Sequence, residues 1–221
     1  MAVELVDLSV PITTGMPVYP GDPEVAVSSA ITVADAGVNV QRLHLGSQSG
    51  THVDAPFHID DAYPRLDEVP LDRFTGSAVV MDVRGLPPRT AIPVEALPDG
   101  LGPGTVLLIA TGWSEHWGTD AYLAHPYPSP ETAEAIIASG VLTVGIDALS
   151  VDRTPDVGDD DFSLDAHRVL CGAGAVIAEN LRSLDRLVEA QALGHRIEVF
   201  LFPLALDADG APVRAVARIS P

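Results

Sequence analysis

The sequence contains no lysine, so all twelve of its basic residues are arginine. The absence of a lysine ammonium excludes Schiff-base catalysis, anchoring of pyridoxal phosphate and a Walker A phosphate-binding loop. A single cysteine, Cys171, excludes an intramolecular disulfide and a zinc site built from several thiolates. The 31 acidic residues give a net charge of −19. Because no basic stretch interrupts this charge, we expect neither nucleic acid nor a membrane surface as a partner.

Long apolar runs are also missing, and no segment approaches the roughly 18 apolar residues of a membrane-spanning helix. The first four residues lack a basic region followed by an apolar run, so we expect no signal peptide and a cytoplasmic location. The 221 residues are 47% hydrophobic and 19% charged, a composition that can bury a core. Without repeats or a linker, residues 1–221 are expected to form a single domain.

Three short apolar runs, at 77–83, 105–111 and 142–146, predict central strands of a sheet that is covered on both faces. A helix is predicted at 130–139, because a serine precedes it as N-cap, a proline opens it and a glycine follows it. Further strands are expected at 4–10, 24–33, 174–181, 197–204 and 213–219, and a second helix at 165–171. This order of elements indicates a mixed α/β domain.

Residues 38–48 alternate apolar and polar positions, which predicts a half-buried strand. Its buried contacts are expected from Val38, Val40, Leu43 and Leu45.

Residues 48–58 combine two histidines, a carboxylate and a carboxamide. In an extended segment, side chains two positions apart share a face, so His52 and Asp54 can point at a common centre. Imidazole and carboxylate together suit zinc or manganese. His58 follows a proline that turns the chain, and it can face the same centre from another direction, as a general base should. The alternative is a turn that carries surface histidines.

A second cluster combines the stretch 165–168 with Glu179. Glu179 follows an apolar run and is therefore expected to be buried, where an unpaired charge is costly. That cost favours a partner for Glu179, either a metal ion or Arg182. The alternative places His167 on a solvated helix face and Glu179 at the exposed end of a strand.

The pattern Gln48-x-Gly-Thr-His52-x-Asp54-x-Pro-x-His58 resembles the signature His-x-Gly-Thr-His-x-Asp-x-Pro-x-His. That signature belongs to the cyclase family of metal-dependent amidohydrolases, which includes kynurenine formamidase (arylformamidase) and isatin hydrolase. The likeness extends over nearly the whole chain, at residues 7–9, 17–22, 70–72, 145–147, 165–179 and 212–216. The resemblance implies a swivelling β/β/α fold with a mixed sheet, in a homodimer or homotetramer.

The resemblance also implies roles for single residues. Metal ligands of a binuclear zinc site would be His52, a bridging Asp54, His167, Glu179 and the residue at position 48. His58 would be the general acid and base, and Tyr19 would line the substrate pocket.

Gln48 departs from the signature, which has histidine at this position. A carboxamide oxygen is a poorer ligand for zinc than imidazole. The site is therefore expected to hold one or two divalent ions, zinc or manganese, with loss of metal as an alternative. His44 is an alternative donor if the strand is regular, although a histidine satisfied within the strand is the simpler interpretation.

The resemblance implies hydrolysis of a carbon–nitrogen bond in a small amide or lactam of the aryl-formamide or isatin type, as in tryptophan catabolism. Trp113 and Trp117 lie in a region that borders the active site in this family, and they suit a flat substrate or else pack a loop. Two alternatives stay open: a cyclase or dehydratase of a small-molecule biosynthetic pathway, and a non-catalytic relative that binds a metabolite.

Three other features are expected to be structural. The acidic run at 156–165 is interpreted as a solvated loop rather than a calcium site. Cys171 is expected to be a small buried residue, and Asp147 to accept structural hydrogen bonds.

Overall fold

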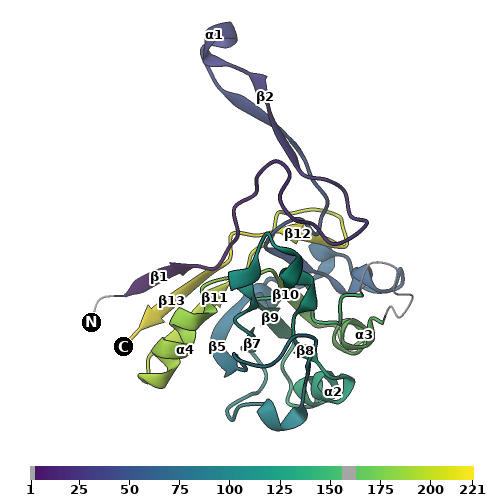
Figure 1. Ribbon diagram of the computed structural model, residues 1–221, viewed down its shortest axis with the longest axis vertical. Helices are drawn as coiled ribbons and strands as arrows, with labels where there is room; N and C mark the ends of the chain where they lie inside the picture. Colours follow the sequence, from purple (N-terminus) through teal and green to yellow (C-terminus); the bar gives the residue numbers. More distant parts are fainter. Residues whose placement is uncertain (1–2, 156–162) are drawn as a thin grey trace.

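The computed structural model describes residues 3–155 and 163–221, so most of the acidic run at 156–165 lies outside the described residues. In the described part, nine strands form one sheet in the order β1-β13-β11-β5-β7-β9-β10-β4-β12 (Figure 1). Their bounds are β1 Glu4–Asp7, β4 His52–Asp54, β5 Thr75–Asp82, β7 Thr105–Ala110, β9 Thr143–Ile146, β10 Val176–Glu179, β11 Arg196–Phe200, β12 Gly210–Pro212 and β13 Val216–Ser220.

The middle of this sheet is parallel, because β5 pairs with β7, β7 with β9 and β9 with β10. Both flanks are antiparallel, with β11, β13 and β1 on one side and β4 and β12 on the other. The predicted mixed α/β fold with a mixed sheet is therefore confirmed. The three apolar runs form the central strands β5, β7 and β9, as their composition predicts.

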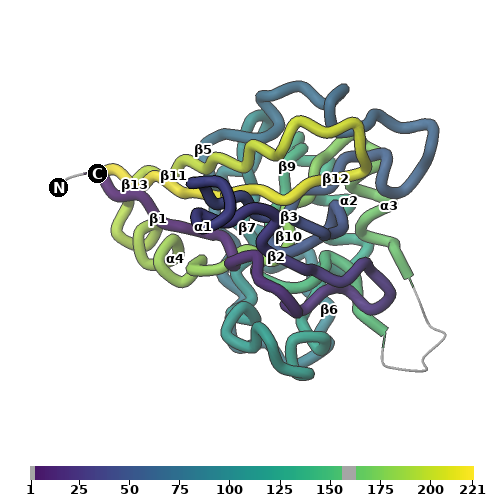
Figure 2. Tube along the Cα trace, turned by 90° about the horizontal axis from the view of Figure 1, so that it is seen from above, coloured from purple at the N-terminus to yellow at the C-terminus, as the bar shows by residue number. Residues whose placement is uncertain are grey.

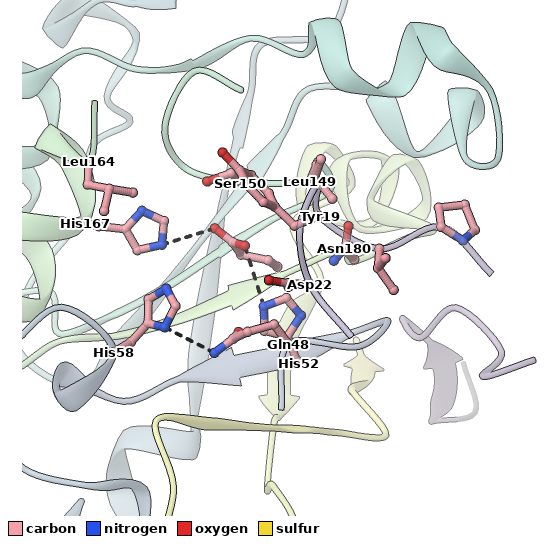
Figure 3. A pocket seen from close by; sticks show the side chains of 13 residues that line it. Tyr19, Asp22, Gln48, His52, His58, Leu149, Ser150, Leu164, His167 and Asn180 are labelled. Carbon is pink, nitrogen blue, oxygen red and sulfur yellow. Dashed lines mark hydrogen bonds and ion pairs between the residues drawn. The ribbon is translucent and has the colours of Figure 1, made fainter. Parts of the chain in front are cut away.

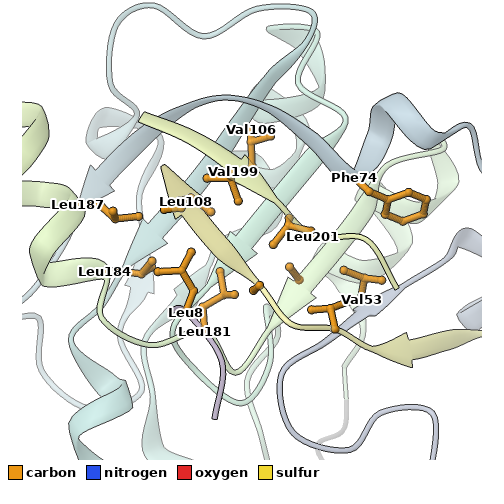
Figure 4. Packing of buried hydrophobic residues seen from close by; sticks show 14 of the residues in the cluster. Leu8, Val53, Phe74, Val106, Leu108, Leu181, Leu184, Leu187, Val199 and Leu201 are labelled. Atoms are coloured by element: carbon orange, nitrogen blue, oxygen red, sulfur yellow. The ribbon is translucent and has the colours of Figure 1, made fainter. Parts of the chain in front are cut away.

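Side chains of β7 alternate between two hydrophobic cores, one on each face of the sheet. Val106 and Leu108 join the core that α4 (Leu184–Ala192) covers (Figure 4). Leu107 and Ile109 join the core on the opposite face, which α2 (Pro130–Ala138) and α3 (Asp165–Gly172) cover. All four side chains are fully or almost fully buried, so a packed layer lies on each face.

Two of the three helices that cover the sheet match their predictions. In α2 the Ser129 hydroxyl accepts a hydrogen bond from the backbone N–H of Thr132 at 3.2 Å, which is the predicted N-cap. The α3 helix begins at Asp165, also as predicted. The α4 helix was not predicted, although Leu184 and Leu187 recur at helical spacing on its buried face.

Short elements complete the described fold. The strands β6 (Ala91–Ile92) and β8 (Tyr127–Pro128) pair with each other. Single 3₁₀ turns are η1 Pro56–His58, η2 Leu66–Glu68, η3 Leu71–Phe74, η4 Val94–Ala96, η5 Trp113–His116 and η6 Asp120–Ala124. None of the described helices is both long and apolar enough to cross a membrane.

A two-stranded arm, residues 26–44, stands away from the body of the molecule (Figure 1) and is projected over the body when seen from above (Figure 2). It consists of β2 (Ala26–Ile31), α1 (Val33–Ala36) and β3 (Val40–His44). The prediction of buried contacts was wrong for Val38, Val40 and Leu43, which are 53%, 43% and 61% exposed. The reason is that β3 pairs only with β2, and within the described chain no further layer packs on either face. Leu45, directly after β3, is partly buried and packs against a small apolar cluster, as predicted.

Candidate active site

Two neighbouring strands bring three candidate metal ligands together. In the antiparallel pair of β10 and β4, Glu179 lies opposite His52. Because Asp54 is two residues further along β4, its side chain is on the same face as His52, as predicted. His52 Nε2 lies 3.4 Å from Asp54 Oδ1 and 3.6 Å from Glu179 Oε2.

The first turn of α3 adds the fourth side chain from above the sheet. His167 Nε2 lies 3.7 Å from Asp54 Oδ2 and 3.5 Å from Glu179 Oε1. Each of the two carboxylates therefore lies between the two imidazoles, with one oxygen toward each. All four side chains are buried.

The outer nitrogen of each imidazole is held by an acceptor. His52 Nδ1 lies 2.8 Å from the Gly50 carbonyl oxygen, and His167 Nδ1 lies 2.7 Å from Asp152 Oδ2. Asp152 also accepts hydrogen bonds from the backbone N–H groups of Ala166 and His167, which fixes it at the start of α3. A proton on Nδ1 leaves the Nε2 lone pair directed at the carboxylates, the arrangement of histidines that bind metal.

The donor set fits a divalent metal ion. Both oxygens of Asp54 are buried and make no hydrogen bond in the described structure. A buried carboxylate without partners is costly, and a cation between the side chains removes that cost. One ligand atom each from His52, Asp54 and Glu179 lies within 4.8 Å of the other two. Imidazole nitrogen with carboxylate oxygen is a ligand combination for zinc or manganese.

Without a metal ion, the carboxylates retain protons on the two histidines. Burial lowers the pKa of His52, but the charges of Asp54 and Glu179 outweigh burial and raise it to about 9. Burial is likewise outweighed at His167, where the hydrogen bond with Asp152 and the nearby charges of Glu179 and Asp54 raise the pKa to about 10. A metal ion that binds here therefore displaces protons from both imidazoles.

Gln48 lines the same site but is turned toward a carboxylate that the sequence did not single out. Its Nε2 donates to Asp209 Oδ2 at 2.8 Å and lies 3.3 Å from His58 Nδ1. Asp209 Oδ2 is also 3.3 Å from His58 Nδ1. Burial lowers the pKa of His58, but the hydrogen bond with Asp209 and the charge of Asp54 outweigh burial and raise it.

These side chains surround a pocket of about 260 Å³ (Figure 3). An apolar wall is formed by Pro17, Val18, Tyr19, Leu149 and Leu164. The polar lining adds Asp22, Ser150 and Asn180 to Gln48, His52, His58, His167 and Glu179. The structure thus brings the predicted residues Gln48, His52, His58, His167 and Glu179 into one pocket with Tyr19. Asp54 does not line the pocket but lies beside His52 and His167.

Trp113 needs a correction, because it does not line this pocket. The indole packs in the core beneath α2 and α3, and its Nε1 donates to the Ala121 carbonyl oxygen at 2.9 Å. Trp117 also lies outside the pocket and packs edge-on against Tyr122. The alternative interpretation, tryptophans that pack a loop, describes both residues.

Two other candidates for the site lie elsewhere. His44 is exposed on β3 of the arm and does not replace the missing histidine. Arg182 is also exposed, and the recorded partners of Glu179 are the two histidines and the backbone N–H of Val151. The two structural expectations are met: Cys171 is buried, and Asp147 accepts hydrogen bonds from Thr111 and Gly112.

Sequence reasoning missed Asn180, which follows Glu179, lines the pocket and hydrogen-bonds the segment that holds His52. Its backbone has a φ of 55°, in the left-handed region, and its Nδ2 donates to the Gly50 carbonyl at 2.9 Å. That carbonyl also holds His52, and Asn180 Oδ1 accepts from the Tyr122 hydroxyl at 2.9 Å. An asparagine directly after an apolar strand was the available signal, because asparagine tolerates the left-handed region.

Residues 6–153 match the protein family described as "Putative cyclase". A kynurenine formamidase of Paracidovorax citrulli is 34% identical over 218 residues, which cover 96% of this chain and 95% of the relative. The chain belongs to the cyclase family. The predicted resemblance is therefore confirmed, and Gln48 is a departure from the family's signature rather than a sign of another family.

Solved structures match the fold. A crystal structure of an isatin hydrolase with the product analogue thioisatinate has a TM-score of 0.87 at 21% identity, and the match covers 99% of this chain and 93% of that one. A structure described as a potential metal-dependent hydrolase with cyclase activity has a TM-score of 0.77 at 25% identity, over 98% and 99% of the two chains. The chain thus has the cyclase-family fold over almost its whole length.

Proposed function

We propose that this cyclase-family chain is a metal-dependent hydrolase that cleaves a carbon–nitrogen bond in a small amide or lactam. The observation that carries the proposal is the pair of buried carboxylates between two histidine Nε2 atoms, with both Asp54 oxygens unpartnered, beside a small pocket. The formamidase names of full-length relatives support an aryl formamide as substrate, and the isatin hydrolase fold supports a lactam as the alternative.

His52, Asp54, His167 and Glu179 would hold the ion. When bound, a divalent ion supplies Lewis acidity and lowers the pKa of water. Zinc and manganese both suit these ligands. Because Gln48 directs its Nε2 at Asp209, we propose one ion per chain, whereas the family resemblance implies two.

His58 is the proposed general base and acid. With Nδ1 beside Asp209, the other ring nitrogen, Nε2, is free to take a proton from water and return it to the leaving nitrogen. The apolar wall around Tyr19 accommodates an aryl ring and excludes water from it. The pocket's size limits the substrate to a small molecule.

The test is turnover of N-formylkynurenine and isatin by the metal-loaded protein and by His58→Ala. We expect His58→Ala to lose about 10²-fold or more in kcat with unchanged metal content. The control is His44→Ala, which changes an exposed histidine on the arm. Absence of turnover on both substrates by the loaded wild-type protein would overturn the proposal, and an active His58→Ala variant would reassign the base.

Gln48 favours one second candidate, a cyclase or dehydratase that uses the same pocket. A changed ligand position alters how the ion is held and thereby which bond is cleaved. Reaction in ¹⁸O-labelled water separates the two: a hydrolase incorporates one labelled oxygen into the acid product, and a dehydratase or cyclase incorporates none.

We also propose that the chain forms a homodimer or homotetramer through the arm. A two-stranded hairpin is at best marginally stable in water, and this arm exposes Val33, Val38 and Leu43 without a covering layer. The arm sequence 26–44 contains one aspartate and one arginine, so it is nearly neutral on a chain with a net charge of −19. Like-charge repulsion between copies is therefore low at the arm.

A further inference from the structure

Asp22 is a carboxylate in the pocket that the proposed chemistry does not use. It is half-buried, it lines the cavity beside Tyr19, and Figure 3 shows both among the pocket side chains. Within the described part of the chain, the Asp22 side chain makes no hydrogen bond or ion pair. The charges that act on it most are those of His52 and His58, with Asp209 and Asp54 after them, so its electrostatic surroundings are the site itself.

The loop that presents Asp22 is preorganised. The backbone N–H of Asp22 donates to the Tyr19 carbonyl oxygen at 3.0 Å, which closes a turn. Gly21 has a φ of 102°, which favours glycine there, and prolines occupy positions 17, 20 and 23. Because proline fixes φ, little conformational freedom remains for this loop to lose when a ligand binds.

The described lining of the pocket contains no permanently charged cation, because its only basic side chains are histidines. The chain has no lysine, none of the described lining residues is an arginine, and the sequence of residues 156–162 contains no basic residue. A substrate carboxylate away from the scissile bond would therefore meet Asp22 without a lysine or arginine to pair with it. An ammonium group at that place would donate a charge-assisted hydrogen bond to the unpaired carboxylate.

We propose that Asp22 is a specificity-determining residue that selects substrates with a protonated amine on the side chain of the aryl amide. This inference rests on the proposed function and names its substrate class: a small aryl formamide that carries an ammonium group. The aryl ring lies along the wall formed by Tyr19, Leu149 and Leu164, and the ammonium donates to the Asp22 carboxylate. The amide lies at the histidine–carboxylate cluster.

The experiment compares four formamides with the metal-loaded enzyme: formanilide (neutral), N-formylkynuramine (cation), N-formylkynurenine (zwitterion) and its deaminated acid (anion). We expect kcat/KM to be highest for the cation and lowest for the anion. In Asp22→Asn the ratio of cation to neutral substrate should fall roughly 10- to 150-fold, the range for a hydrogen bond to a charged group. The matched control is Asp99→Asn, which removes the same charge from an exposed turn.

A second measurement does not depend on turnover. Calorimetry measures the binding of kynuramine and of aniline to wild type, Asp22→Asn and Asp99→Asn. Tighter binding of kynuramine that is lost only in Asp22→Asn supports the inference, even if no formamide is hydrolysed and the proposed function fails. Equal losses for cationic and neutral compounds in Asp22→Asn, or an equal effect of Asp99→Asn, would overturn the inference while leaving the hydrolase intact.

Discussion

Gln48 donates a hydrogen bond through Nε2 to Asp209 Oδ2 at 2.8 Å, at the position where the family signature has histidine. The same carboxylate oxygen lies 3.3 Å from His58 Nδ1, so one acceptor serves the altered ligand position and the proposed base. The hydrogen bonds with His58 and Gln48 hold the pKa of the Asp209 carboxyl well below its usual range.

In Gln48→His we expect a second equivalent of zinc per chain. An imidazole at position 48 can donate to Asp209 with one nitrogen and bind metal with the other, the histidine–carboxylate arrangement of zinc sites. Zinc titration by calorimetry, checked by elemental analysis, counts the equivalents. Gln41→His on the exposed strand β3 is the control for an added histidine. Unchanged stoichiometry together with lost turnover would show instead that Gln48 serves the substrate or His58.

Asp152→Asn should weaken metal binding by about 10- to 100-fold. The carboxylate of Asp152 orients His167 through Nδ1 at 2.7 Å, and an amide in its place holds the ring less firmly. Competition with a chelating indicator measures the affinity. Asp165→Asn, at the exposed start of the same helix, should leave it unchanged. Equal affinities for the two variants would contradict a supporting role for Asp152.

Metal binding should release about two protons per ion at pH 7, because His52 and His167 have pKa values near 9 and 10 in the metal-free protein and must be neutral as ligands. Calorimetry in buffers of different ionisation enthalpy measures this number. Metal affinity should therefore rise with pH up to about pH 10. A reaction enthalpy that is independent of the buffer would rule out these protonated histidines.

The raised pKa values of His52 and His167 predict that rising pH destabilises the metal-free protein but increases the stabilisation that metal provides. Both folded-state pKa values exceed the unfolded value of about 6.5. Their stabilising contribution in the metal-free protein is therefore complete below pH 6.5 and is lost as pH rises through 9 and 10. We expect the unfolding temperature of the metal-free protein to fall between pH 6.5 and 10, and the gain on adding metal to grow. Parallel pH profiles with and without metal would be inconsistent with this assignment.

The double variant Val38→Ser, Leu43→Ser should weaken self-association by about tenfold or more, since each exposed apolar side chain would be covered in the oligomer. Light scattering over a dilution series measures the mass. Gln41→Ser on the same strand is the control, because it changes an exposed polar residue. A monomeric wild-type protein at all concentrations would remove the arm from any role in assembly.

Sequence patterns predicted those parts of the fold whose cause is local. The apolar runs of β5, β7 and β9 are buried because a central strand is covered on both faces. The strand period placed His52 and Asp54 on one face. The interpretation of β3 failed because alternation shows that one face is apolar, but not whether another layer lies there.

Partners distant in sequence explain the residues that were missed. Asp209 lies 161 positions from Gln48, and a carboxylate in a polar turn carries no local sign of such a contact. Asp152 lies 15 positions from His167, across residues whose pattern shows no regular element. Trp113 was assigned to the pocket from its region in the family, and the core on that face of the sheet had room for its ring.

The pairing of β4 with β10 sets His52 opposite Glu179 and Asp54 opposite Ile177. Since successive side chains of a strand point to opposite faces, a slip of β4 by one residue would turn both of its ligands away from Glu179 and His167. Such a misfolded molecule would keep most of its sheet and its overall shape, and ordinary spectroscopy would hardly distinguish it. Its capacity for a tightly held ion would be gone, so metal uptake after refolding counts the molecules in which β4 has found its native alignment with β10.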